Sequence, residues 1–303
     1  MIPKDNWSAI MGVADLDDAI RRNLNKIPDA ISQITYLPSG SLLPSTLTAL
    51  YRNTALSWID SQGRTRPLAA GQRLAGSDST GSAKKGGMRL LLADFANSAE
   101  EVQRVREWLR GIEEPGTSLI GAVISSPDAE TELDVALARS TGPTILASRL
   151  LHNEGLELTA VSFEGIIAPA GNWRLQARSG VSQPLTCPSA KIGLLVSRRP
   201  ERHRAAVIEW LRRHGVLYNE LAMSGALSRG GWVNAKSLGR LMESYSRAGI
   251  SYVLEQDRVR ASIVANATQL PTVSWAEQRT VRSGTAPAMG RTIALRIGGG
   301  RRA

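Results

Sequence analysis

Polar side chains follow several predicted strands in the second half of the chain, at the points where these strands end. In an open parallel sheet the carboxyl ends of the strands form the edge where ligands bind, so these side chains are the first candidates for chemistry. Carboxylates at such an edge can serve as nucleophile, acid/base or Mg²⁺ ligand, and cationic side chains can hold a phosphate. The candidates are Ser162, Glu164, Ser197, Arg198, Arg199, Lys236, Gln256, Asp257 and Arg258.

The elements that must position these residues alternate between strand and helix. Continuous apolar runs predict buried strands, and amphipathic runs predict helices between them. This alternation predicts an α/β fold, with two doubly wound parallel-sheet domains covered by helices on both faces. The expected strands are 88–93, 119–125, 158–163, 191–196, 221–223 and 250–254, and the expected helices are 98–111, 129–139, 200–214 and 235–248.

The breaks between these runs predict the division of the chain. We expect an N-terminal segment over 1–30, a first domain over 31–152, a second over 153–276 and a basic tail over 277–303. The segment 71–87 is rich in Gly, Ser and Lys, which indicates a surface loop.

Two blocks of the second half carry a family resemblance. They read PERHRAAVIEWLRRHGVLYNELAMSG and AGISYVLEQDRVRASIVANATQLPTVSW. Both resemble the haloacid dehalogenase-like phosphatase domain of phage-type polynucleotide kinase/phosphatase, over about 115 residues. The resemblance implies that Ser162 lies at the nucleophile position, Glu164 at the acid/base position and Ser197 at the hydroxyl position. It also implies a phosphate-binding Lys236, and Gln256 with Asp257 at the metal-holding pair.

The residues present at these positions differ from those that the chemistry uses. The nucleophile position holds a serine where the family has aspartate, and one carboxylate of the metal pair is replaced by Gln256. The sequence therefore predicts a vestigial site at Ser162, Glu164, Ser197, Lys236 and Asp257, with no catalytic residue assigned. Arg198, Arg199, Lys236 and Arg258 could still hold a phosphodiester electrostatically.

The first half is similar in order and spacing to the P-loop kinase that precedes the phosphatase in this family. The segment SQITYLPSGSLLPSTLTAL places a strand, a turn and a helix opening at Ser45-Thr46 where the family has its phosphate-binding loop. Pro44 stands at the position of the phosphate-binding lysine and supplies neither charge nor N–H. The degenerate loop residues are Ser39, Gly40, Ser41, Ser45 and Thr46, and Arg139 lies at the position of a lid arginine.

Composition and charge restrict the classes of protein to which this chain can belong. The net charge is +10, and residues 1–150 carry 16 basic and 17 acidic side chains, so all of the excess lies in the second half. Such asymmetry indicates a polyanionic partner, with DNA and RNA both open. One cysteine, Cys187, excludes internal disulfides and thiolate metal clusters, and the histidines His152, His203 and His214 do not cluster, so no metal site is predicted. No apolar stretch reaches the length of a membrane span.

These observations lead to three interpretations. The first is a catalytically degenerate polynucleotide kinase/phosphatase-like protein, a pseudoenzyme with a nucleic-acid-binding, phosphate-binding or scaffolding role and no cofactor. The second is a virus coat or virion assembly protein on a reused α/β scaffold, which would self-assemble into particles visible by light scattering. The third is an active, diverged metal-dependent phosphatase that uses Glu164 and Asp257 and would require Mg²⁺. A cytoplasmic or virion location fits all three.

Overall fold

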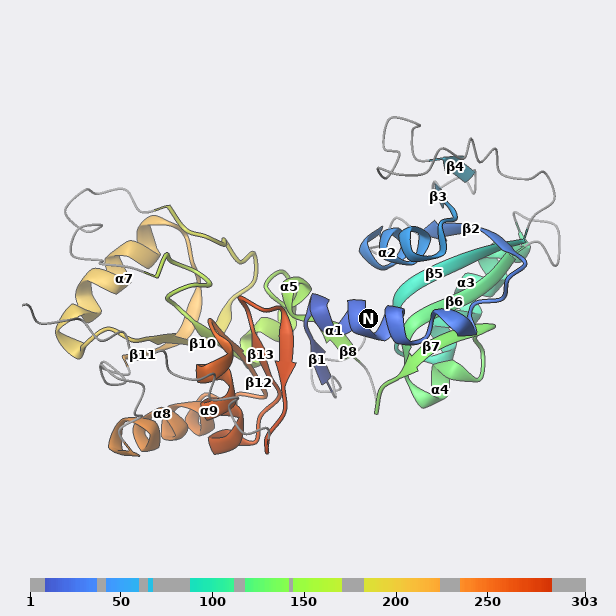
Figure 1. The fold of residues 1–303 in the computed structure, drawn as a ribbon. Helices are drawn as coiled ribbons and strands as arrows, with labels where there is room; N and C mark the ends of the chain where they lie inside the picture. Colours follow the sequence, from blue (N-terminus) through green and yellow to red (C-terminus); the bar gives the residue numbers. More distant parts are fainter. Residues whose placement is uncertain are drawn as a thin grey trace, which may run out of the picture.

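Two mixed α/β units, each built on a largely parallel sheet, make up the described part of the chain (Figure 1). The computed structural model describes residues 9–36, 42–59, 65–67, 88–111, 118–141, 144–170, 183–223 and 235–284. The expectation of a βα rhythm that gives parallel sheets is thereby confirmed. The predicted loop at 71–87 and the loop residues Ser39, Gly40 and Ser41 lie outside the described residues.

The first sheet has six strands in the order β4-β3-β2-β5-β6-β7. All neighbours are parallel except β3 and β4. The strands are β2 (Ile31–Tyr36), β3 (Ala55–Ile59), β4 (Thr65–Pro67), β5 (Met88–Ala96), β6 (Ser118–Ser125) and β7 (Val135–Arg139). The helices beside it are α1 (Val13–Arg22), α2 (Leu42–Arg52), α3 (Ala99–Arg110) and α4 (Pro127–Glu130).

Apolar side chains cover both faces of this first sheet. On one face Leu90 and Leu92 pack with Leu16 and Ile20 of α1. On the other face Leu91 packs with the buried side of α3. Alternate side chains of β5 thus pack into the hydrophobic cores on opposite faces of the sheet, as expected for a strand that is buried on both sides.

The helix predicted at 129–139 is wrong. The Ser126 hydroxyl caps a single helical turn, α4, by accepting from the Ala129 N–H at 3.2 Å. The chain then enters β7, in which Val135 and Leu137 are buried while their neighbours are less so. This two-residue alternation is typical of a strand, and pairing with β6 decides the outcome over the helical propensity of the alanines. Arg139 therefore ends a strand.

The second sheet also has six strands, in the order β11-β10-β9-β12-β13-β14. Only β14 runs antiparallel to its neighbour. The strands are β9 (Thr159–Ser162), β10 (Ile192–Ser197), β11 (Tyr218–Met223), β12 (Tyr252–Glu255), β13 (Thr272–Ser274) and β14 (Arg279–Val281). Its helices are α7 (Arg204–Arg213), α8 (Ala235–Arg247) and α9 (Arg258–Thr268).

Helices cover both faces of this second sheet as well. Leu195 and Leu254 pack against α7 through Val207 and Leu211, whereas Leu194 and Val253 face Leu241 of α8 and its neighbours. Figure 1 shows α7 on one side of this sheet and α8 on the other. The last strand, β14, lies in the segment that the sequence assigns to the tail, so the sheet continues past residue 276.

The N-terminal segment connects the two sheets. Strand β1 (Ala9–Met11) pairs with β8 (Thr144–Leu146), which precedes the short helix α5 (Ala147–Leu150) between the sheets. Ile10 belongs to the core of the second unit, whereas Leu16 and Ile20 belong to the core of the first. Between them, a Cβ atom on Gly12 would lie 1.9 Å from the Gln278 carbonyl oxygen, so only glycine fits this close approach.

Candidate functional site

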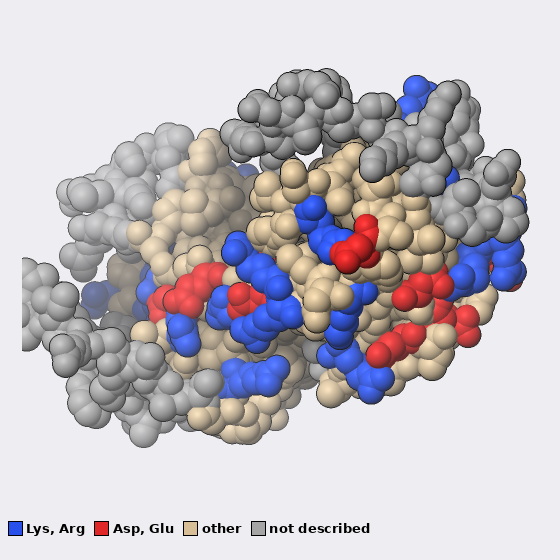
Figure 2. All heavy atoms as spheres, turned by 45° about the vertical axis from the view of Figure 1, so that its right-hand side comes forward, with Lys and Arg blue, Asp and Glu red and all other residues tan. Residues whose placement is uncertain are grey.

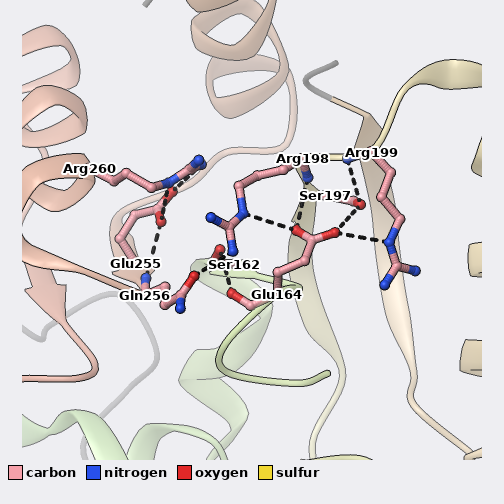
Figure 3. Close-up of polar contacts among 8 residues, drawn as sticks. All are labelled: Ser162, Glu164, Ser197, Arg198, Arg199, Glu255, Gln256 and Arg260. Carbon is pink, nitrogen blue, oxygen red and sulfur yellow. Dashed lines mark hydrogen bonds and ion pairs between the residues drawn. The ribbon is translucent and has the colours of Figure 1, made fainter. Parts of the chain in front are cut away.

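The candidate site lies at the carboxyl edge of the second sheet, where β9, β10 and β12 end side by side. Val196 is the register partner of Ser162, and Leu254 is the register partner of Val161. Ser162, Ser197 and Gln256 therefore meet at one edge, as the strand ends predict (Figure 3). Glu164 follows β9 in a turn that a backbone bridge to Ala168 holds in place.

The Glu164 carboxylate is the centre of this cluster. One oxygen, Oε1, accepts from the Ser197 hydroxyl at 2.8 Å and lies 3.3 Å from Nε of Arg199. The other, Oε2, accepts from the Arg198 backbone N–H at 2.9 Å and lies 3.6 Å from Nε of Arg198. The side chain is 8% exposed, so this carboxylate is buried, and Figure 3 shows its oxygens directed at Ser197, Arg198 and Arg199.

Gln256 fixes the opposite side of the cluster. Its Oε1 accepts from Nη2 of Arg198, and its side chain packs against Gly165. Gly165 has a φ of +86°, and a Cβ atom there would lie 2.3 Å from Cγ of Gln256. Gln256 thus links the Glu164 turn to the arginine that follows β10.

Arg199 is held from a second direction by aromatic rings. Its guanidinium lies 4.8 Å from the centre of the Phe163 ring, and Phe163 in turn meets Trp210 edge-on at 5.3 Å. Burial lowers the pKa of Arg199, the Glu164 carboxylate opposes this effect, and the nearby Arg198 charge adds to it. Glu164 is therefore the group that keeps this buried cation stable.

A second ion pair, not foreseen from the sequence, lies beside the first. Glu255, the last residue of β12, is 1% exposed and pairs with Arg260 through oxygens 3.1 and 3.3 Å from the guanidinium nitrogens. Burial pulls the pKa of Arg260 down, but Glu255 and other carboxylates raise it overall. The signal that could have identified the pair is a charged residue at the end of a buried strand, since a buried carboxylate needs a partner.

Ser162 and Asp257 both make bonds that stabilise local structure. The Ser162 hydroxyl donates to the Glu164 carbonyl at 3.3 Å, and Asp257 caps α9 by accepting from the Arg260 N–H at 2.9 Å. Arg258 points outward, with a side chain that is 52% exposed and a nitrogen 4.0 Å from Glu277. Lys236 lies in the first turn of α8, and its side chain is outside the described part.

Three candidate residues of the first half lie in the described part of the chain, Ser45, Thr46 and Arg139, and these three do not gather in this way. Ser45 is buried in α2 and donates to the Leu92 carbonyl at 3.1 Å, and Thr46 donates to the Leu42 carbonyl at 2.7 Å. Helix α2 starts at Leu42, so Pro44 lies within its first turn, where a missing N–H is tolerated. Arg139 is exposed and pairs with Glu130.

A buried carboxylate of the first unit lies in β5. Asp94 is 2.6 Å from the Arg149 guanidinium, and burial raises its pKa while Arg149 opposes the rise. Arg149 comes from α5, between the two sheets, so this pair stabilises the connection between the units.

Charged side chains of both signs lie on the described part of the face that Figure 2 shows. On α7, Arg204 pairs with Glu201, and Arg212 and Arg213 both lie near Glu209. Among the described residues, no three His, Cys, Asp or Glu side chains are grouped so as to hold a metal ion. None of the described helices combines the length and apolar character that a bilayer crossing demands.

Comparisons with known proteins add little to this geometry. No protein-family model matches the chain, and no curated protein matches it in sequence. Among solved structures, it is similar to the purine phosphoribosyltransferase from Pyrococcus horikoshii Ot3, with 15% identity and a TM-score of 0.32 over 46% of this chain and 91% of that one. It is also similar to a hypothetical protein from Neisseria gonorrhoeae with bound ppGpp, with 11% identity and a TM-score of 0.32 over 46% and 88% of the two chains. Likeness at this level carries no weight for the fold or function of this chain.

Proposed function

We propose that this protein is a catalytically inactive relative of polynucleotide kinase/phosphatase that binds nucleic acid without cleaving its phosphate esters. The observation that carries the proposal is the set of hydrogen bonds and ion pairs that the Glu164 carboxylate makes. An acid/base catalyst must be free to exchange a proton with the reacting group. Both oxygens of Glu164 instead face a hydroxyl, a backbone N–H and two guanidinium groups.

The residues present do not fit a Mg²⁺ ion. Magnesium requires oxygen ligands in near-octahedral geometry, and a site of this kind uses carboxylates. Glu164 is surrounded by cations, and Gln256 accepts from Arg198 with its only side-chain oxygen. Asp257 supports the start of α9. Two arginines beside the would-be ligands also repel a divalent cation.

The same cations support binding to a polyanion. The Arg198 side chain is 30% exposed at the edge of the sheet. Arg258 follows Gln256 by two positions in the sequence, and its side chain is 52% exposed. Residues 171–182, 224–234 and 285–303 contain seven arginines and no acidic residue, so they account for much of the excess positive charge by composition alone. Basic side chains of this kind favour phosphate backbones of either DNA or RNA.

Equilibrium binding of a labelled single-stranded oligonucleotide across a series of salt concentrations tests this proposal. We expect binding that weakens steeply with salt, and an Arg198→Gln variant that binds more weakly with a salt slope reduced by about 1. The matched control is Arg110→Gln, at an exposed position in the last turn of α3, which should leave affinity unchanged. Absence of binding at low salt, or an equal loss in both variants, would contradict the proposal.

A further inference from the structure

The groups around Glu164 form a cage for an oxyanion. They comprise the Ser197 hydroxyl, the Arg198 backbone N–H and the guanidinium groups of Arg198 and Arg199 (Figure 3). Donors of these kinds are the ones that proteins use to hold phosphate and carboxylate oxygens. In this structure the occupant is a carboxylate from the chain itself.

We infer that Glu164 occupies, from within the chain, a binding site for a phosphate monoester dianion and blocks that site until its side chain moves away. This inference rests on the proposed function, because it concerns the same edge of the same sheet. It adds that the site is closed in the resting protein and identifies the residue that closes it. An inorganic phosphate or a terminal phosphate group would take the place of the carboxylate.

The geometry allows such an exchange with little rearrangement. The backbone of the Glu164 turn is fixed by the bond from the Gly165 N–H to the Ala168 carbonyl, so only the side chain must move. Arg198 is 30% exposed, which places one wall of the cage at the surface. The other wall, Arg199, is buried and stacked on Phe163, so it stays in place when the carboxylate leaves.

Without the Glu164 carboxylate, the positive charges of Arg198 and Arg199 would need another anion beside them. Removing one partner of a buried ion pair leaves an uncompensated charge, which destabilises the fold unless a new counter-ion binds. Phosphate should therefore restore the stability that loss of Glu164 removes. This expectation is opposite to that for a catalytic carboxylate, whose neutralisation abolishes function.

The test uses Glu164→Gln, which keeps the size of the side chain and removes its charge. Thermal unfolding of the full chain is followed in phosphate and in chloride at equal ionic strength. We expect the variant to unfold at a lower temperature than the wild type in chloride, and phosphate to raise its midpoint selectively. Isothermal titration with inorganic phosphate should give an affinity about tenfold or more above that of the wild type, since a bound competing carboxylate is gone.

The matched control is Glu209→Gln on α7, which also removes one carboxylate that pairs with two arginines but lies at the surface. It should show no phosphate-specific gain. If Glu164→Gln does not fold, Glu164→Asp provides the second test, because its shorter side chain withdraws the carboxylate from the donors while keeping the charge. We expect it to bind phosphate more tightly than the wild type.

The outcomes separate this inference from the proposed function. Phosphate affinity that is unchanged in both Glu164 variants, or raised equally by Glu209→Gln, would overturn the inference. Oligonucleotide binding by the wild type would leave the proposed function intact in that case. Conversely, a phosphate-specific gain without any oligonucleotide binding would support the closed site and reject the nucleic-acid role.

Discussion

Single residues decide the character of the candidate site, because each polar side chain there has a partner whose removal would be costly. Glu164 balances two arginines, and Glu255 balances a third. The positions could be predicted from the sequence, since strands that end together bring their following residues together. Which side chains form ion pairs with one another could not be predicted, because ion pairing depends on side-chain rotamers that strand patterns do not specify. Arg198 and Arg199 were expected to face a ligand, and in the structure they face Glu164.

Gly165 offers a direct test of how the Glu164 turn is held. An alanine there would adopt an unfavourable positive φ and its Cβ would overlap Gln256. We expect Gly165→Ala to lower the free energy of unfolding by about 2–4 kcal/mol, from backbone strain and overpacking together. Urea denaturation measures this change.

Gly215→Ala is the matched control for that substitution. Gly215 also has a positive φ, +67°, but nothing lies within 4 Å of an added Cβ. Only backbone strain remains, so we expect Gly215→Ala to lower the free energy of unfolding by about 1–2 kcal/mol. Equal losses in the two variants would show that Gln256 does not constrain the turn.

Among the elements, those with strong sequence patterns were predictable. They are the strands β5, β6, β9, β10, β11 and β12 and the helices α3, α7 and α8. The apolar run over 191–196 is β10, as expected. Ser98 caps α3 by accepting from the Glu101 N–H at 3.3 Å. The failure at 129–139 arose because a four-residue helix and a five-residue strand follow each other within one alanine-rich run. Strand pairing, which sequence windows do not contain, separates the two.

The burial of β12 has a consequence at alkaline pH. Tyr252 opens this strand at the centre of the second sheet, and burial raises its pKa from 10.0 to about 12. The folded state therefore holds the phenolic proton more tightly than the unfolded state does. The stability that this difference in the pKa of Tyr252 contributes is fully present below pH 10 and is lost as the pH rises toward 12.

Tyr252→Phe should accordingly lose less stability than the wild type over that pH interval. Chemical denaturation at several pH values between neutrality and the alkaline limit measures the difference. Parallel curves for Tyr252→Phe and the wild type would contradict the burial argument.

At the scale of the whole molecule, the N-terminal segment joins the two units. Asp15 lies in the first turn of α1. Its Oδ2 accepts from the Gly12 N–H at 3.2 Å and from the Thr280 N–H of β14 at 2.6 Å. Arg279 of β14 pairs with Asp18 at 2.6 Å. The sequence did not predict this arrangement, because its contacts join residues that are more than 250 positions apart.

Removal of the Asp15 carboxylate should weaken the connection between the units. We expect Asp15→Ala to lower the free energy of unfolding by about 1–3 kcal/mol, because two backbone donors lose their acceptor. Limited proteolysis should then cut between the sheets sooner than in the wild type. Asp29→Ala removes a fully exposed aspartate that pairs with Arg52, and it should change neither readout. Identical behaviour of the two variants would show that Asp15 does not hold the units together.

The role proposed for this protein is to bind phosphate esters without cleaving them. The most direct measurement is the release of inorganic phosphate from a 3′-phosphorylated oligonucleotide incubated with the full chain and Mg²⁺. We predict no release above the background without protein, and the same result for Glu164→Gln. Mg²⁺-dependent release by the wild type that disappears in Glu164→Gln would contradict the claim and identify Glu164 as a working acid/base.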